Sequence, residues 1–205
     1  EVINVMSFHK FNFELIVVDD GSKDNTHQVL KQLTCKIKNL SVIYLRKNYG
    51  QTAAMAAGFE NSNGDILITL DGDLQNDPKD IPKLISEINN GYDLICGWRF
   101  DRKDKLINRK IPSKIANKLI AKVTGLKLHD YGCSLKAFRK EIIDDIKLYG
   151  ELHRFLPVLA NIEGARIKEI KVNHRSRKYG SSKYGIDRTF RAVSYTHLTL
   201  PTTTI

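Results

Sequence analysis

The stretch Gly64–Pro78, GDILITLDGDLQNDP, decides how the rest of the chain is interpreted. Its residues Ile66–Leu70 form a short apolar run between turn formers, a pattern typical of a strand buried on both faces of a parallel sheet. If the backbone stays extended beyond this run, Asp71, Asp73 and Gln75 point to one side, because side chains two apart in a strand share a face. Their oxygens would suit a hard divalent cation such as Mg2+ at the carboxyl end of the strand.

Two other interpretations of this acidic stretch are a surface turn and a calcium loop. The surface turn stays open, because Asp, Gly and Asn are turn formers in their own right. A calcium loop of the EF-hand type is disfavoured, because Asn76 stands where that loop needs Gly and Pro82 stands where it needs Glu.

Length and composition indicate one ordinary globular domain. The chain has 205 residues and 41% hydrophobic residues, enough to bury a full core. The cysteines Cys35, Cys96 and Cys133 are odd in number and far apart, in or beside apolar runs, which predicts buried, reduced thiols in an intracellular protein and no zinc site. The sequence contains neither an apolar run of membrane-spanning length nor a signal peptide.

The net charge of +10 is concentrated in two stretches. Residues 99–122 and residues 166–191 each hold nine basic and two acidic residues, whereas the remainder of the chain is acidic. Basic patches of this kind could bind nucleic acid, an anionic membrane surface or a phosphorylated substrate.

Strands and helices alternate along the first half of the chain. Besides Ile66–Leu70, the expected strands are Phe13–Val18, Val42–Leu45 and Asp93–Gly97. The first ends in Asp19 and Asp20, and the second leads into a basic turn where Gln51 opens an alanine-rich helix, a candidate anion site. This order predicts a doubly wound α/β domain whose ligand crevice collects the loops after the strands.

The segment 106–123 is predicted to be a basic amphipathic helix. Isoleucine, leucine and valine recur every four residues from Ile107 to Val123, and lysine recurs at the same interval from Lys110 to Lys122. Pro112 should kink this helix or mark its start. Such a helix could face the core with one solvated side, or it could lie on an anionic bilayer.

Five stretches carry a resemblance to a known family. They are VVDDGSKDNT, LRKNYGQTAAMAAGFENSNGDILITLDGDLQNDP, GCSLKAF, HRFLP and HRSRKYGSSKYG, within Phe13–Arg191. In this order they resemble the family 2 glycosyltransferases that charge polyprenyl phosphate, such as dolichol-phosphate mannose synthases. The resemblance implies a Rossmann-like GT-A fold with a mixed sheet, a UDP- or GDP-linked sugar donor, Mg2+ or Mn2+, and hexose transfer to polyprenyl phosphate at the cytoplasmic face of a membrane. No nucleic-acid partner is expected.

The resemblance also assigns roles to individual residues. The implied metal and diphosphate ligands are Asp71, Asp73 and Gln75, and the implied nucleotide-sugar contacts are Asp19, Asp20, Gln51 and Asp71. The groups that face the acceptor phosphate are Arg99, Arg109, Ser113, Arg177 and Lys183. Of all these, the residues assigned to catalysis are Asp73, Arg99, Arg109 and Arg177. Lys136 and Arg154 are also placed near the site.

The chemistry of this reaction agrees with such a set of residues. A lipid phosphate oxygen is already anionic near neutral pH, so its attack on the anomeric carbon needs no strong general base. What the reaction needs is control of charge, because two anions must be held together and a diphosphate must leave. A single in-line displacement would invert the anomeric configuration.

Both ends of the chain depart from the family pattern. The family opens with a strand that helps to hold the nucleotide, and we expect this strand to be missing beside Phe13–Val18. Residues Val193–Thr202, VSYTHLTLPT, correspond to a translated transposase sequencing adaptor, so we interpret 1–192 as the glycosyltransferase domain and 193–205 as a non-native tail. We therefore expect the chain as it stands to be inactive. The alternatives are a family 2 transferase with a saccharide or other acceptor, and a non-catalytic basic module that binds membrane or nucleic acid.

Overall fold

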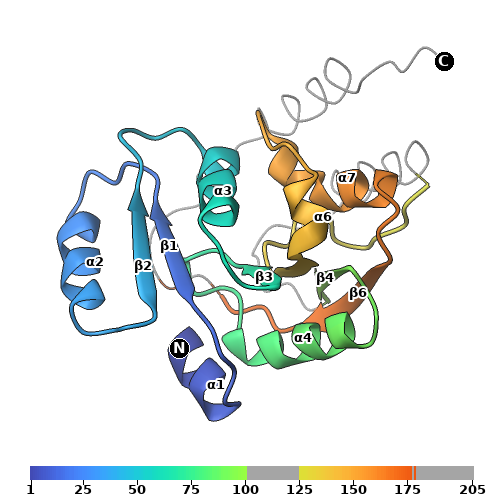
Figure 1. The fold of residues 1–205 in the computed structure, drawn as a ribbon, viewed down its shortest axis with the longest axis horizontal. Helices are drawn as coiled ribbons and strands as arrows, with labels where there is room; N and C mark the ends of the chain where they lie inside the picture. The colour runs from blue at the N-terminus through green and yellow to red at the C-terminus, as the bar shows by residue number, and fades with distance from the viewer. Residues whose placement is uncertain (101–124, 177, 179–205) are drawn as a thin grey trace.

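The computed structural model describes residues 1–100, 125–176 and 178 (Figure 1). The α-helices are α1 (Val2–Phe8), α2 (Thr26–Thr34), α3 (Gln51–Glu60), α4 (Ile81–Asn89), α6 (Lys140–Asp144) and α7 (Leu156–Ile162). The strands are β1 (Leu15–Asp19), β2 (Leu40–Tyr44), β3 (Ile66–Thr69), β4 (Leu94–Arg99), β5 (Lys136–Arg139) and β6 (Ile167–Val172). Two short 3-10 helices are η1 (Pro78–Asp80) and η2 (Leu152–Arg154).

The strands form two sheets. β1 and β2 pair in parallel, with Leu15 opposite Leu40, and a second sheet has the order β3-β5-β4-β6. In that second sheet β5 runs antiparallel to β3 and β4, whereas β4 and β6 are parallel. A mixed α/β architecture is therefore confirmed. The strands do not form one continuous sheet, because in the described part of the chain no strand lies between β1 and β3.

Helices cover both faces of the four-stranded sheet, with α4 on one face and α6 and α7 on the other (Figure 1). α4 is amphipathic and buries the side chains of Ile81, Leu84, Ile85 and Ile88. They pack with β4 and β5 and with Met6 of α1 into one core cluster. The opposite cluster joins side chains of β3, β4 and β5 to α6 and α7. Two such layers hold the ends of β3 and β4 in fixed positions.

β1 is less buried than the sequence pattern predicts. None of its apolar side chains, Leu15–Val18, is fully buried. In β3 only Leu67 is buried, and its neighbours Ile66 and Ile68 are half-buried. The prediction that β3 is buried on both faces is therefore wrong. β1 and β3 are each an edge strand, and they lie where the two sheets are separated.

Some further expectations are corrected or lie outside the described residues. Cys35 is exposed, not buried, because no side chain of α2 is buried, although all three cysteines are free as predicted. No helix within residues 1–100 and 125–176 is long and apolar enough to cross a membrane. The predicted helix at 106–123 and the tail at 193–205 fall outside the described residues.

Candidate active site

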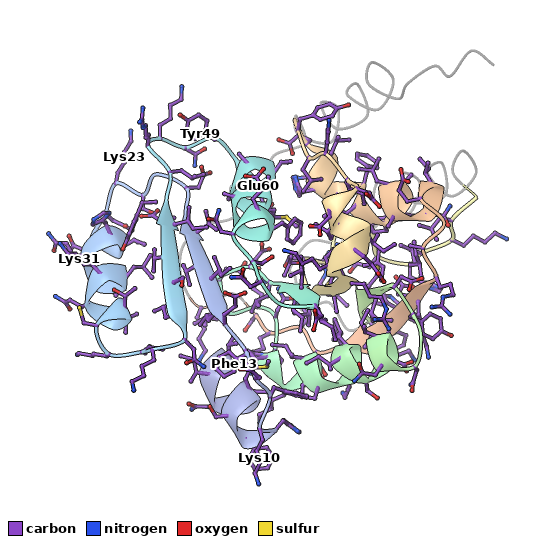
Figure 2. All side chains as sticks on the ribbon, viewed as in Figure 1. Lys10, Phe13, Lys23, Lys31, Tyr49 and Glu60 are labelled. Carbon is purple, nitrogen blue, oxygen red and sulfur yellow. The ribbon has the colours of Figure 1, made fainter. Side chains whose placement is uncertain are left out.

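The loops that follow β1 and β2 meet at one end of the smaller sheet. Figure 2 shows the labelled Lys23 and Tyr49 in these two loops. The carboxylate of Asp20 accepts hydrogen bonds from the backbone N–H groups of Tyr49 (2.7 Å) and Gly50 (2.9 Å). Asp19 instead closes its own turn, because its Oδ1 accepts from the N–H of Ser22 at 2.9 Å. Asp20 therefore fixes the loop that opens α3.

Gly21 lets these two loops approach closely. Its φ is +69°, and a Cβ at this position would lie 2.5 Å from the carbonyl carbon of Lys47 and 2.7 Å from the nitrogen of Asn48. Both atoms belong to the main chain and cannot move aside as a side chain could. A side chain at position 21 would therefore separate Asp20 from the start of α3.

Gln51, the first residue of α3, joins this loop to the loop after β3. Its Nε2 donates a hydrogen bond of 2.9 Å to Oδ1 of Asp71. Two residues proposed for nucleotide-sugar binding, 20 positions apart in the sequence, thus meet at the start of α3. The adjacent Thr52 shares a buried hydrogen bond of 2.7 Å with Nδ1 of His153, which fixes α3 against η2.

Asp71 lies in a strongly charged environment. Burial raises the pKa of Asp71, a hydrogen bond from the Ser134 side chain opposes that shift, and the neighbouring Asp73 raises the pKa further. The positive charges of Lys136 and Arg99 act in the opposite direction, and the net result is a raised pKa. Two carboxylates and two cations therefore influence one another at the ends of β3, β4 and β5.

The backbone after β3 does not stay extended, so one premise of the sequence interpretation is wrong. β3 ends at Thr69, a turn follows at 72–73, and Leu74 has a φ of 63°. The carboxylate of Asp73 stabilises this turn, because its Oδ1 accepts from the N–H of Gln75 at 3.1 Å. Gln75 then directs its Nε2 to the carbonyl of Arg175 at 3.4 Å. The directions of the Asp71, Asp73 and Gln75 side chains therefore depend on the geometry of this turn and not on the alternation of a strand.

The donor chemistry of the loop fits a hard divalent cation. Asp71 and Asp73 are close enough for the charge of one to raise the pKa of the other. A cation of the Mg2+ type needs only one or two protein carboxylates, with oxygen ligands in its other positions. Among the described residues no group of three or more His, Cys, Asp and Glu side chains could hold a metal, so such a site would depend on two carboxylates and the amide of Gln75.

Arg99 lies at the end of β4 and is held by Asp130. Its Nε and Nη2 donate to the two carboxylate oxygens of Asp130 at 2.7 and 2.8 Å, and both side chains are largely buried. The N–H of Asp130 in turn donates to Glu169 at 2.8 Å. Such a bidentate pair fixes the guanidinium plane more firmly than a single contact would.

The other basic residues of the predicted site have different positions. Lys136 is buried and its Nζ donates to the backbone carbonyls of Tyr131 and Cys133. Arg154 is half-buried, with its Nε 3.9 Å from Glu151. Four predicted acceptor-phosphate residues lie outside the described residues: Arg109, Ser113, Arg177 and Lys183.

Sequence reasoning missed several members of this network. Asp130, Ser134 and Thr52 are not among the expected site residues, and Thr52 pairs with a residue 101 positions away. Only the motif GCSLKAF, which contains Ser134, carried a signal for any of them. The contacts of these residues join parts of the chain that are distant in sequence, so only the folded structure shows them.

Comparison with known proteins supplies a family and a fold. Residues 2–147 match the profile of the family described as Glycosyl transferase family 2. The chain is 50% identical over 196 residues to a dodecaprenyl-phosphate galacturonate synthase of Rhizobium johnstonii, which covers 94% of this chain and 58% of that protein. It is 43% identical over 176 residues to an undecaprenyl-phosphate 4-deoxy-4-formamido-L-arabinose transferase of Aeromonas hydrophila, covering 85% of this chain and 54% of that protein.

A solved structure of similar fold supports the predicted fold class. Glucosyl-3-phosphoglycerate synthase from Mycobacterium tuberculosis, solved with Mn2+ and UDP-glucose, superposes with a TM-score of 0.68 at 18% identity over 96% of this chain and 72% of that one. The predicted GT-A type of α/β fold is thereby confirmed. The chain spans little more than half the length of the two curated relatives.

Proposed function

Because the chain belongs to glycosyltransferase family 2, we propose that it is the catalytic part of an enzyme that transfers a sugar from a nucleotide sugar to polyprenyl phosphate. The observation that carries this proposal is its 50% identity, over 94% of the chain, to a dodecaprenyl-phosphate galacturonate synthase. A second relative named for undecaprenyl phosphate supports the same class of acceptor. A family 2 transferase with a saccharide acceptor is the second candidate.

In the proposed reaction an oxygen of the lipid phosphate attacks the anomeric carbon of the donor sugar. The bond from that carbon to the nucleoside diphosphate breaks as the new bond forms, so the configuration inverts. The electron pair of the broken bond leaves with the diphosphate. No proton needs to be removed from the nucleophile, since a phosphate monoester is anionic at neutral pH.

The described residues would serve this reaction by placing charge. Asp20 and Gln51 hold the loops around the start of α3, where a helix N-terminus favours an anion. Arg99 and Lys136 contribute positive charge close to Asp71, which would offset the repulsion between a donor diphosphate and an acceptor phosphate. We propose Arg109, Ser113, Arg177 and Lys183 as further contacts to the acceptor phosphate.

We also propose a divalent cation, Mg2+ or Mn2+, held by Asp71, Asp73 and Gln75. When bound, such an ion would neutralise charge on the departing diphosphate. The proximity of two carboxylates supports this assignment. Since the acceptor is a lipid, the enzyme is expected to work at the cytoplasmic face of a membrane.

The test is a transfer assay with the full-length protein. UDP-galacturonate and a panel of other UDP- and GDP-sugars are offered with undecaprenyl phosphate and Mg2+ or Mn2+, and glycolipid product is measured by mass spectrometry. We expect product with at least one donor, its loss in chelator, and its loss in Asp73→Asn. Transfer to a saccharide but not to lipid phosphate would favour the second candidate. Full activity in chelator would refute the metal assignment.

If the chain is instead a non-catalytic binding module, Asp73→Asn should have a different effect. Asp73→Asn removes one negative charge, so a basic module should keep or increase its affinity for anionic vesicles or nucleic acid. An enzyme should instead lose turnover while the protein stays folded. Turnover and binding measured on one preparation therefore separate the two classes.

A further inference from the structure

Two segments far apart in the sequence are fastened together beside the candidate metal loop. Residues 75–80 follow the acidic loop after β3, and residues 173–175 follow β6. Asn76 and His174 form an isolated antiparallel bridge between them. The N–H of Arg175 donates to the carbonyl of Gln75 at 2.8 Å, so the two main chains are joined next to a proposed metal ligand.

Side chains strengthen this connection at both ends. Nη2 of Arg175 lies 2.6 Å from Oδ1 of Asp77, and its Nη1 lies 2.6 Å from a carboxylate oxygen of Glu1. Further along, the buried carboxylate of Asp80 accepts from the backbone N–H of Asn173 at 2.7 Å and from its side-chain amide at 3.2 Å. The end of β6 is thus bound on both sides of Arg175.

Asp77 connects the Arg175 side chain to the segment that follows Gln75. It caps η1, because its Oδ1 accepts from the N–H of Lys79 at 3.1 Å, so the direction of the chain between the acidic loop and α4 depends on it. The same carboxylate oxygen lies 2.6 Å from Nη2 of Arg175, so Asp77 joins Arg175 to the start of η1.

We propose that Arg175 is a positioning residue for Gln75. Its guanidinium pairs with Asp77 and thereby fixes the main chain of residue 175, whose N–H donates to the Gln75 carbonyl and whose carbonyl accepts from the Gln75 side-chain amide. This arrangement would hold that amide at the proposed metal and diphosphate site. Arg175 acts through its neighbours and does not touch substrate. The inference rests on the proposed function, because it assumes that this loop binds a metal with a nucleoside diphosphate. The ordinary alternative is a surface ion pair that only stabilises the fold.

A matched control lies at the other end of β6. Arg166 immediately precedes β6 and forms a forked pair with Asp93, at 3.2 Å from Nε and 3.3 Å from Nη2. This pair has the same chemistry and flanks the same strand, but it is remote in the fold from the acidic loop, since β6 separates the two ends. Arg166→Gln therefore reports the cost of losing an arginine–aspartate pair in general.

The experiment measures binding rather than turnover. Free Mn2+ is followed by electron paramagnetic resonance while the full-length protein is titrated with Mn2+ and UDP or GDP. The proteins compared are the wild type, Arg175→Gln, Arg175→Lys, Asp77→Asn and Arg166→Gln. We expect Arg175→Gln to weaken Mn2+ binding by about 10-fold or more, the usual scale for an outer residue that orients a ligand. Asp77→Asn should match it, and Arg166→Gln should match the wild type.

Additional variants distinguish positioning from loss of stability. The double variant Arg175→Gln/Asp77→Asn should be no weaker than either single variant, because both remove one interaction. Arg175→Lys should recover part of the affinity, and Glu1→Gln should leave it unchanged. Arg175→Gln and Arg166→Gln should lower the melting temperature by similar amounts. Hydrogen exchange of the backbone amide of Gln75 should nevertheless be faster in Arg175→Gln than in Arg166→Gln.

Three results would overturn the inference. These are wild-type Mn2+ affinity in Arg175→Gln, an equal loss in Arg166→Gln, and unchanged exchange at Gln75. In each of them the wild type would still bind Mn2+ with nucleotide, so the proposed function would survive. A wild-type protein that binds neither UDP nor GDP with Mn2+ would overturn both.

Discussion

The side-chain amide of Gln51 donates a hydrogen bond of 2.9 Å to Oδ1 of Asp71, and this contact links α3 to the loop after β3. α3 also packs against β1, since Gly58 of the helix approaches Val18. The two sheets share no strand ladder within the described residues, so α3 is a principal link between them. The Gln51–Asp71 bond therefore combines a structural role with its position in the candidate site.

Replacing Gln51 by Leu should destabilise the protein. The substitution removes a donor from a partly buried carboxylate, and we expect a loss of about 1–2 kcal/mol in the free energy of unfolding at pH 7. Urea denaturation measures it, with Gln28→Leu on the exposed face of α2 as control. In an Asp71→Asn background the same substitution should cost less, and equal costs in both backgrounds would contradict a direct Gln51–Asp71 interaction.

Asp71→Asn should stabilise the metal-free protein at neutral pH while it removes metal binding. Burial and the charge of Asp73 raise the pKa of Asp71, so the folded state holds this proton more tightly than the unfolded chain does. The associated stability is complete below the ordinary value of 3.8 and is lost as the pH rises through the raised pKa. Asp71→Asn should therefore melt a few degrees higher than the wild type at pH 7.5.

The pH dependence of that difference is the check. The advantage of Asp71→Asn should shrink as the pH falls through the raised pKa and should vanish below 3.8, where Asp71 is protonated in both states. The exposed Asp65→Asn, which lies just before β3, serves as control and should shift the melting temperature little at any pH. An Asp71→Asn protein that is less stable than the wild type at pH 7.5 would contradict the raised pKa.

Gly21→Ala should be more damaging than Gly125→Ala or Gly72→Ala. The positive φ alone costs an L-residue about 1–2 kcal/mol, and here the new methyl group would also meet main-chain atoms of Lys47 at 2.5 Å. Gly125 also has a positive φ, but a Cβ there would meet no atom within 4 Å. Gly72 has neither a positive φ nor an atom within 4 Å of an added Cβ. Urea denaturation should rank the losses Gly21→Ala, Gly125→Ala, Gly72→Ala, and a loss at Gly21 no larger than at Gly125 would exclude the contact.

The parts of the fold that were predicted are those encoded locally. Apolar runs such as Asp93–Gly97 located the strands to within a few residues, and the alanine-rich stretch that Gln51 opens located α3. The backbone after Leu70 was mispredicted, because a turn with a positive φ at Leu74 leaves no periodic signal. The pairs Arg99–Asp130 and Thr52–His153 could not be predicted either, since each joins residues that only the folded sheet brings together.

Arg99→Lys should reduce transfer to polyprenyl phosphate in the full-length enzyme. Lysine lacks the planar fork that Asp130 holds at two points, so its ammonium would not occupy the same position. We expect at least a tenfold loss in kcat/KM for the lipid phosphate. Arg139→Lys, near Asp93 at 3.5 Å, is the control, and wild-type kinetics in both variants would count against a role for Arg99 at the acceptor phosphate.

The final prediction concerns the unpaired edges of β1 and β3, each of which has one strand neighbour in the described part of the chain. The N–H of Leu15 bonds to Asn39, and the carbonyl of Asp19 accepts from Leu45, so these residues face β2. Because backbone groups alternate along a parallel strand, those of Ile16 and Val18 are directed to the other edge. Such an edge can accept a further strand.

We propose that one more parallel strand, added at the N-terminal side, joins the two sheets. It would cover the half-buried side chains of β1 and fix the loop of Asp20 relative to the loop of Asp71, so the chain without it should bind nucleotide weakly. Hydrogen exchange should show fast amides at Ile16 and Val18 and a slower amide at Val17. In a chain extended by such a strand, Ile16 and Val18 should become protected, and calorimetry should show tighter binding of UDP or GDP with Mn2+. Slow exchange at Ile16 and Val18 without the extension would show that this edge is already covered.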